Sequence, residues 1–333
     1  MCACFGGGTG SALSPADAPA PGLLELVAWQ VGLGPRFPGS EAHRKLTREL
    51  ARRLEGYAGL TLSQNFSLDL PGGRAECANL TGVFRPGRGR KQPSRQSPAY
   101  WPARQERVSR RQERVSPLLL GTHFDTRLTA DRESDPALRE QPIPGANDGG
   151  SGTAVLLSLL PELARLAREG GLSREVRVVF FDAEDVGGIG GLPFSVGAGL
   201  YAREPPLEPP GEALVLDMVG GSGLVLDVDA HALAHPPSLE LTRRVFAAGR
   251  EVDGAVFRAG KLKHVISDHY PFLRAGIASC LLIDLDYPEW HTQADLPAAM
   301  SERSLATIAA AVLRFLRDPR RSSPHDSGGY AGP

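Results

Sequence analysis

Short apolar runs alternate with amphipathic stretches along the chain from residue 118 onward. An amphipathic helix is predicted over Ser151–Arg168, although Pro161 is expected to kink it or displace its start, and Ser301 is expected to cap a last helix. The apolar runs predict buried strands at Leu118–Leu120, Glu175–Phe181, Ala213–Leu216 and Leu281–Leu285. Strands that alternate with helices indicate a mixed, largely parallel sheet covered on both faces.

The first part of the chain predicts one helix and a pair of strands. Ser40 is expected to cap a helix that ends near Leu54. Strands are predicted at Leu60–Leu68 and Cys77–Phe84, with a turn at Pro71-Gly72-Gly73 between them.

Both ends of the chain look unlike the middle. Residues 1–21 are rich in Gly, Ala, Pro and Ser and predict a disordered tail, and a second such tail is predicted at 318–333. We therefore expect one domain over residues 22–317.

A basic segment interrupts this domain at residues 85–116. It holds ten Arg or Lys against two Glu, a net charge of +8, and it repeats the string RQERVS at 104–109 and 111–116. One interpretation is a basic arm for an acidic partner. The composition favours the simpler one, a solvated low-complexity insertion between two strands.

Composition excludes several classes of protein. The 333 residues are 41% hydrophobic and 23% charged, which rules out a disordered chain, and the net charge of −1 gives the molecule as a whole no electrostatic reason to bind nucleic acid or anionic lipid. The four cysteines are too few and too scattered for a disulfide framework. The start of the chain lacks the pattern of a signal peptide, and no run approaches the ~20 apolar residues of a membrane helix. We expect a cytoplasmic protein that binds neither nucleic acid nor membrane; its oligomeric state stays open.

Candidate chemistry lies just past the ends of the predicted strands. Sites in open α/β sheets form outside the carboxyl ends of the strands, so these side chains are expected to gather. Several carboxylates lie together only near positive charge, and mixed His and carboxylate ligands suit a zinc ion. The residues are His123, Asp125, Asp148, Glu184, Asp185, Asp217 and His291.

Each of these residues alone has a simpler interpretation. An Asp after a strand is more often a helix cap or turn former, and a lone His, such as His269, is more often a hydrogen-bonded structural residue. The same chemistry recurs at the same topological place, and this coincidence favours a metal site.

Six strings in fixed order resemble a known superfamily. GTHFDTR, GANDGGSG, FFDAED, VLDMVG, SDHYPF and YPEWHT are similar to motifs of the zinc aminopeptidase and glutaminyl cyclase superfamily. GPRFPGSEAHRKL resembles the segment that opens its cyclase-like branch. The resemblance covers roughly residues 22–317, apart from the basic segment. It implies a single-domain three-layer α/β/α sandwich with a twisted mixed, mostly parallel sheet.

The resemblance also implies a zinc site. Asp148, Asp185 and His291 match the ligands of the cyclase zinc, and Glu184 matches the general acid/base. One carboxylate of the adjacent pair would bind the metal while its neighbour stays free to move protons. One zinc ion is therefore expected.

Ligands for a second zinc are present too. His123 and Asp217 match the extra ligands of aminopeptidases, with Asp148 then bridging two ions. Asp125 matches the carboxylate that orients the His123 ring. The sequence therefore allows two ions as well as one.

Two chemistries are implied, both acting on the N-termini of peptides or proteins. A glutaminyl-peptide cyclotransferase converts N-terminal glutamine to pyroglutamate and releases ammonia. A metallo-aminopeptidase cleaves off the N-terminal residue with activated water. The third possibility, a non-enzymatic binding protein on the same fold, predicts substitutions at ligand positions, and here those positions are intact.

Some features favour the cyclase. Trp290 precedes His291 in a Trp-His-Thr string that resembles cyclases, where the indole forms part of a small apolar substrate pocket; the simpler interpretation is a core tryptophan. The segments HFDTR, QPIPGAND and DYPEWHT also look more like bacterial cyclase-like proteins than like secreted aminopeptidases.

Other features favour the aminopeptidase. Cyclases usually carry Asp-Asp-His, with the first Asp in a catalytic hydrogen-bond network, whereas this chain has Ser267-Asp268-His269. The Ser267 hydroxyl, a candidate for substrate binding, can still hydrogen-bond but carries no charge. Asp268 is the candidate to compensate, with Asp217 as a further catalytic candidate, and Phe194 is the candidate for the aromatic residue that lines the pocket of animal cyclases.

Overall fold

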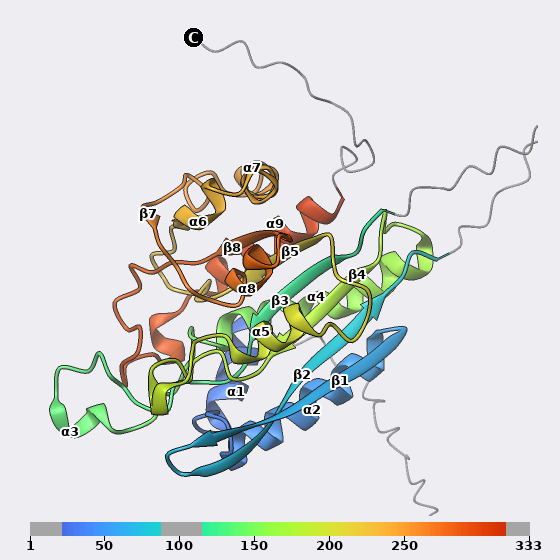
Figure 1. The fold of residues 1–333 in the computed structure, drawn as a ribbon. Coiled ribbons are helices and arrows are strands. Elements are labelled where there is room, and N and C mark those ends of the chain that lie inside the picture. Colours follow the sequence, from blue (N-terminus) through green and yellow to red (C-terminus); the bar gives the residue numbers. More distant parts are fainter. Residues whose placement is uncertain (1–21, 88–114, 318–333) are drawn as a thin grey trace, which may run out of the picture.

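A six-stranded sheet crosses the domain, with helices on both of its faces (Figure 1). The computed structural model describes residues 22–87 and 115–317, so the predicted tails at 1–21 and 318–333 and most of the basic segment lie outside the described residues. The strand order is β1-β2-β4-β3-β5-β8. The strands are Leu60–Leu70 (β1), Gly73–Phe84 (β2), Leu118–His123 (β3), Val176–Phe181 (β4), Glu212–Leu216 (β5) and Ala278–Leu282 (β8).

The sheet is mixed and mostly parallel, as predicted. Strands β4, β3, β5 and β8 run parallel to one another, whereas β1 and β2 form an antiparallel hairpin that joins β4 at one edge. The hairpin turns at Pro71 and Gly72, and its strands pair from Leu60 opposite Val83 to Leu70 opposite Gly73. The carboxyl ends of the parallel strands therefore lie at one edge of the sheet.

Both faces of the sheet are buried. Successive strand residues point to opposite faces, so Val178 and Phe180 of β4 lie in the larger core while Val179 and Phe181 lie in a second cluster. The larger core packs against α1, α2, α4, α7 and α9, and the second cluster against α5 and α8, which confirms the three-layer sandwich. These helices are Leu23–Gly32 (α1), Glu41–Tyr57 (α2), Gly150–Glu169 (α4), Val196–Arg203 (α5), Pro236–Arg250 (α7), Tyr270–Arg274 (α8) and Glu302–Leu316 (α9).

Short elements complete the described part of the chain. Strands Val228–Asp229 (β6) and Leu262–Lys263 (β7) form a separate parallel pair. The remaining helical turns are Pro136–Arg139 (α3), Ala230–Leu233 (α6), Ile189–Gly191 and Pro297–Ala299. Within residues 22–87 and 115–317, none of the helices combines the length and the apolar character needed to span a bilayer.

Both predicted helix caps are confirmed. The Ser40 hydroxyl accepts a hydrogen bond from the His43 N–H, and Ser301 accepts one from Ser304. The predicted displacement of the helix start at Pro161 is wrong: α4 runs from Gly150 to Glu169 with the exposed Pro161 inside it, so the helix continues although one backbone hydrogen bond is lost there.

The predicted strand at Leu281–Leu285 is shifted. Strand β8 ends at Leu282, because the apolar run continues into the loop, where the Leu285 N–H donates to the Asp227 carboxylate. Helix α7 was not among the predicted elements, and it begins with Pro236 and Pro237. Proline has no N–H to leave unpaired in the first turn of a helix, so it begins one readily.

Candidate metal and catalytic site

The seven predicted site residues converge at the carboxyl ends of the parallel strands. His123 ends β3, Asp217 directly follows β5, and the Glu184–Asp185 pair follows β4 after two residues. The loop after β8 brings in His291, and the loop before α4 brings in Asp148. These segments lie far apart in the sequence, and only the parallel sheet brings them together.

One group of potential ligands consists of Asp148, Asp185 and His291. Their ligand atoms all lie within 4.8 Å of one another, and all three residues are buried. His291 Nε2 lies 3.4 Å from Asp148 Oδ2 and 3.3 Å from Asp185 Oδ1. Asp185 Oδ2 is buried without a hydrogen-bond partner among the described residues, as expected of an oxygen that a cation satisfies.

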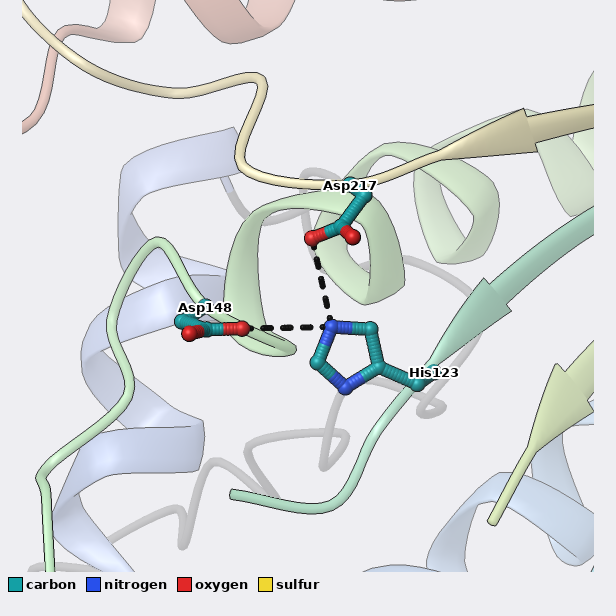
Figure 2. A group of neighbouring side chains, drawn as sticks. All are labelled: His123, Asp148 and Asp217. Carbon is teal, nitrogen blue, oxygen red and sulfur yellow. Dashed lines mark hydrogen bonds and ion pairs between the residues drawn. The ribbon is translucent and has the colours of Figure 1, made fainter. Parts of the chain in front are cut away.

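A second group shares Asp148 with the first. His123 Nε2 lies 3.3 Å from Asp148 Oδ1 and 3.3 Å from Asp217 Oδ1 (Figure 2). Asp148 therefore points one carboxylate oxygen at each histidine, the arrangement a bridging carboxylate needs. The donor set, two imidazoles and three carboxylates, fits one or two zinc ions.

The charges around these ligands favour a cation. Burial alone would lower the pKa of His123, but Asp125, Asp148 and Asp217 raise it well above its usual value. Burial likewise opposes a charged His291, yet Asp185 and Asp131 raise its pKa to about 10. Burial and the charge of Asp185 raise the pKa of Asp148 to about 6. At both histidines, the attraction of the carboxylates therefore outweighs the cost of burying a charge.

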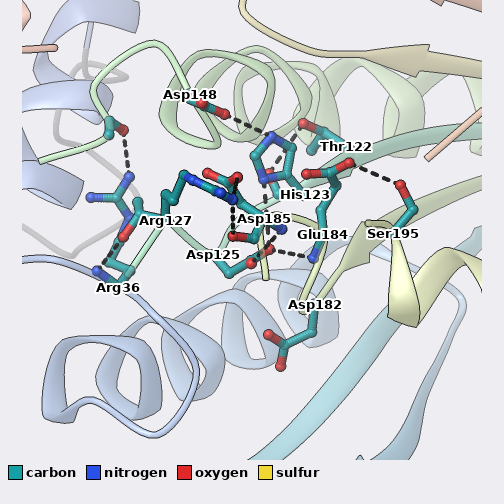
Figure 3. Close-up of polar contacts among 12 residues, drawn as sticks. Arg36, Thr122, His123, Asp125, Arg127, Asp148, Asp182, Glu184, Asp185 and Ser195 are labelled. Carbon is teal, nitrogen blue, oxygen red and sulfur yellow. Dashed lines mark hydrogen bonds and ion pairs between the residues drawn. The ribbon is translucent and has the colours of Figure 1, made fainter. Parts of the chain in front are cut away.

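Glu184 lies beside the ligands but belongs to neither group. Its Oε1 accepts a hydrogen bond of 2.8 Å from the Ser195 hydroxyl (Figure 3). Burial raises its pKa well above the usual value, and the charges of Asp268, Asp185 and Asp217 add to that rise. A carboxyl group with a raised pKa holds a proton more strongly than usual, which suits a residue that takes and returns one.

Asp125 holds the backbone of the Glu184–Asp185 pair. Its two oxygens accept hydrogen bonds of 3.1 Å from the N–H groups of Glu184 and Asp185 (Figure 3). The expected contact with the His123 ring is longer, 3.6 Å from Asp125 Oδ1 to His123 Nδ1. The carboxylate therefore fixes the proton-carrying residue as well as facing the ring.

The backbone is unusual at the site. Ala183, Met218 and His291 are non-glycine residues with φ values of 57°, 46° and 58°. Such conformations cost about 1–3 kcal/mol each and cluster where the surrounding structure enforces a functional geometry. Ala183 precedes Glu184 and Met218 follows Asp217, so these bends direct site residues into the pocket.

A pocket of about 280 Å³ opens onto these groups. Asp148, Glu184, Asp185, Asp217 and His291 line its polar side. The rest of its wall is formed by Phe194, Met218, His264, Val265, Ile266, Ile283, Leu285 and Trp290. The predicted pocket residues Trp290 and Phe194 therefore both reach this cavity.

Comparison with known proteins identifies the family. Peptidase family M28 matches residues 106–316. The chain belongs to peptidase family M28. No curated protein matches it.

Solved structures of bacterial proteins share the M28 chain's fold. Tannerella forsythia glutaminyl cyclase is 25% identical with a TM-score of 0.73, over 89% of this chain and 97% of that one. A leucine aminopeptidase precursor from Bacteroides thetaiotaomicron is 24% identical with a TM-score of 0.73, over 89% and 96%. A Zn-dependent exopeptidase from Parabacteroides distasonis is 23% identical with a TM-score of 0.73, over 89% and 97%. The family indicates an enzyme, and structures named for both chemistries share its fold.

Two predicted residues of the M28 site lie behind the pocket. Ser267 is buried and its hydroxyl donates to Asp217 Oδ2 at 2.8 Å, so it holds a potential ligand and does not line the cavity. Asp268 is fully buried, and neither of its oxygens has a hydrogen-bond partner within the described ranges. Burial raises its pKa well above the usual value, and Asp125 and Asp217 add to the rise.

Sequence reasoning missed a chain of charged residues behind the first ligand group. Asp131 Oδ1 lies 2.9 Å from His291 Nδ1, and its Oδ2 accepts two hydrogen bonds from Arg127. Arg127 Nη1 also donates to Asp185 Oδ1 at 3.2 Å. The spacing of Arg127 and Asp131 in the sequence does not distinguish them from the other charged residues of the same loop.

A further set fixes the loop that carries Asp148. Buried Arg36 donates to the carbonyls of Pro144 and Gly145. Asp295 accepts the N–H groups of Asn147 and Asp148 at 2.8 and 3.1 Å. Arg36 stands in the GPRFPGS string that the resemblance included, so the string was the available signal.

Proposed function

We propose that this protein is a zinc-dependent glutaminyl-peptide cyclotransferase that converts the N-terminal glutamine of peptides to pyroglutamate and releases ammonia. One observation carries the proposal: Glu184 and the ligands Asp185 and His291 open into a small pocket whose other lining residues are mostly apolar and include Trp290. A cavity of this size fits one uncharged side chain next to a proton carrier.

Asp148, Asp185 and His291 would hold the zinc. A bound zinc supplies Lewis-acid polarisation of the side-chain amide carbonyl. The unpartnered Asp185 Oδ2 supports this assignment, and so do the carboxylates around His291, whose negative charge would favour a bound cation.

The chain's own residues would carry out the proton transfers. The pocket holds the α-amine of the substrate glutamine close to the carbonyl carbon of its side-chain amide, so the attack is intramolecular. A new bond forms between the amine nitrogen and this carbon, and the bond from the carbon to the side-chain amide nitrogen breaks. Glu184 takes a proton from the α-amine and returns one to the departing ammonia. The Ser195 hydroxyl donates a hydrogen bond to Oε1 of Glu184, so Oε2 remains available to the substrate.

Asp217 and Asp268 would support this proton transfer. Beside burial, their charges raise the pKa of Glu184, which strengthens its hold on a proton taken from the substrate. Asp268 thereby supplies a carboxyl group that the neutral Ser267 lacks.

An aminopeptidase is the second candidate. It is favoured by the complete group of His123, Asp148 and Asp217, which offers ligands for a second zinc. In this case Glu184 would take a proton from the attacking water, and the scissile peptide bond would break.

A parallel assay separates the two. Zinc-loaded protein receives a Gln-Ala peptide and a Leu-Ala peptide, and Glu184→Gln serves as the control. Ammonia together with loss of one ammonia mass from the Gln peptide supports the cyclase. Free leucine instead supports the aminopeptidase, and no product from either peptide supports a binding protein.

A further inference from the structure

Arg132 is held against the outside of the pocket wall. Its guanidinium carbon lies 4.2 Å from the centroid of the Trp290 ring. Its backbone N–H donates to the carbonyl of His291 at 3.3 Å. Two contacts with residues far away in the sequence therefore fix the place of this arginine.

This position lies next to the reaction site. Trp290 lines the pocket, and its ring centroid is 4.7 Å from that of His291. One aromatic ring thus separates the guanidinium from a potential metal ligand. Arg132 is exposed, so the guanidinium can also be reached from solvent.

The charge of Arg132 is not neutralised by its neighbours. Asp131 is engaged by Arg127 and His291, and the Glu133 carboxylate accepts hydrogen bonds from the N–H groups of Gln293 and Ser134. Across residues 22–87 and 115–317, no carboxylate lies within ion-pair distance of Arg132. The arginine is therefore a fixed cation with a free polar edge.

The pocket next to it is acidic. Asp148, Glu184, Asp185 and Asp217 all line the cavity, and a zinc ion held by Asp148, Asp185 and His291 would offset only part of their charge, so a further positive charge nearby favours a peptide that carries a carboxylate. Arg132 offers that charge at the side of the cavity where Trp290 forms the wall. Complementary charge at such a place governs specificity more than overall affinity.

We propose that Arg132 selects peptides that carry a carboxylate on the second or third residue, an inference that rests on the proposed function. With the first side chain in the pocket, this proposal places the rest of the peptide along Trp290, which lines the pocket and contacts the guanidinium. An extended peptide advances about 3.3–3.6 Å per residue, so the second and third residues are the ones within reach of a group one aromatic ring away. The carboxylate is either an acidic side chain or the free C-terminus of a short peptide.

Matched peptides test the proposal. Zinc-loaded protein is given Gln-Gln-Ala-amide, Gln-Glu-Ala-amide and Gln-Gln-Ala with a free carboxylate, and kcat/KM is measured from ammonia and from released first residue. The second peptide tests the side-chain carboxylate and the third tests the terminal one. The variants are Arg132→Gln, Arg132→Lys and, as a control, Arg48→Gln on the exposed side of α2.

In the wild type, kcat/KM should be higher for the two peptides that carry a carboxylate than for Gln-Gln-Ala-amide. In Arg132→Gln this preference should fall about two- to fivefold, the range of an exposed ion pair. The preference should remain in Arg132→Lys and Arg48→Gln, and it should weaken with added salt. Equal preferences in the wild type and in Arg132→Gln would overturn the proposal. Ammonia released from the neutral peptide would still support the proposed function in that case. If the wild type converts none of the three peptides, the proposed function fails and this inference fails with it.

Discussion

Oδ1 of Asp131 lies 2.9 Å from Nδ1 of His291, while Nε2 of the same ring faces Asp148 and Asp185. The two ring nitrogens thus have different partners. A carboxylate at Nδ1 keeps the proton on that nitrogen and leaves Nε2 free to bind a metal. Arg127 holds the other oxygen of Asp131, so the orientation of the ring depends on a residue outside the predicted ligand set.

Asp131→Asn should weaken zinc binding about 10- to 100-fold, the range found when a carboxylate behind a metal-bound histidine is removed. Competition with a chelating dye measures the affinity. Asp135→Asn is the matched control, because Asp135 caps α3 in the same loop without contacting a ligand. Equal zinc affinities of wild type and Asp131→Asn would show that the ring needs no such support.

Glu184→Gln should reduce turnover about 10²- to 10⁴-fold, because the amide cannot carry a proton. Ser195 can still hydrogen-bond to the amide, so the fold should be unchanged. Zinc content is also expected to be unchanged, since Glu184 belongs to neither ligand group. Rate, metal analysis and thermal unfolding are measured on one preparation, and a variant with wild-type turnover would exclude Glu184 as the proton carrier.

His291→Ala and Asp185→Ala should each sharply lower the zinc content, because each removes one of the three ligands of the first group. His235→Ala is a suitable control, since His235 bonds to Ser238 at the start of α7, outside both groups. Metal analysis after dialysis provides the measurement. Stoichiometric zinc in both ligand variants would disprove the ligand assignment.

Sequence reasoning found the residues that stand at the ends of strands. Apolar runs marked β3, β4 and β5, and the polar residues after them met where parallel strands end. Patterning failed where apolar residues continued beyond the strand, as at Ile283, and where prolines opened α7.

Supporting residues could not be predicted in the same way. Arg36 binds backbone carbonyls more than a hundred positions away, and Asp131 meets His291 160 positions along the chain. Contacts of this kind have no spacing that a sequence can show. The fold determines them, and the sequence alone reveals only the ligands they support.

Glu212 should contribute to stability in a pH-dependent way. Burial would raise its pKa, but Arg174 and Arg244 outweigh burial and lower it. A carboxylate whose folded pKa is depressed stabilises the protein above its unfolded pKa of about 4.3, and this contribution is lost as pH falls through the folded value. Glu212→Gln should therefore lower the free energy of unfolding by about 1.5–3 kcal/mol at pH 7, as expected for hydrogen bonds to a charged group. The difference from wild type should shrink below pH 4, measured by denaturant titration. Glu240 is exposed and lies 4.0 Å from Arg244, so Glu240→Gln serves as the control and should change the free energy of unfolding little at either pH. If Glu212→Gln lowered the free energy of unfolding equally at pH 7 and below pH 4, the charge of Glu212 would not be the cause.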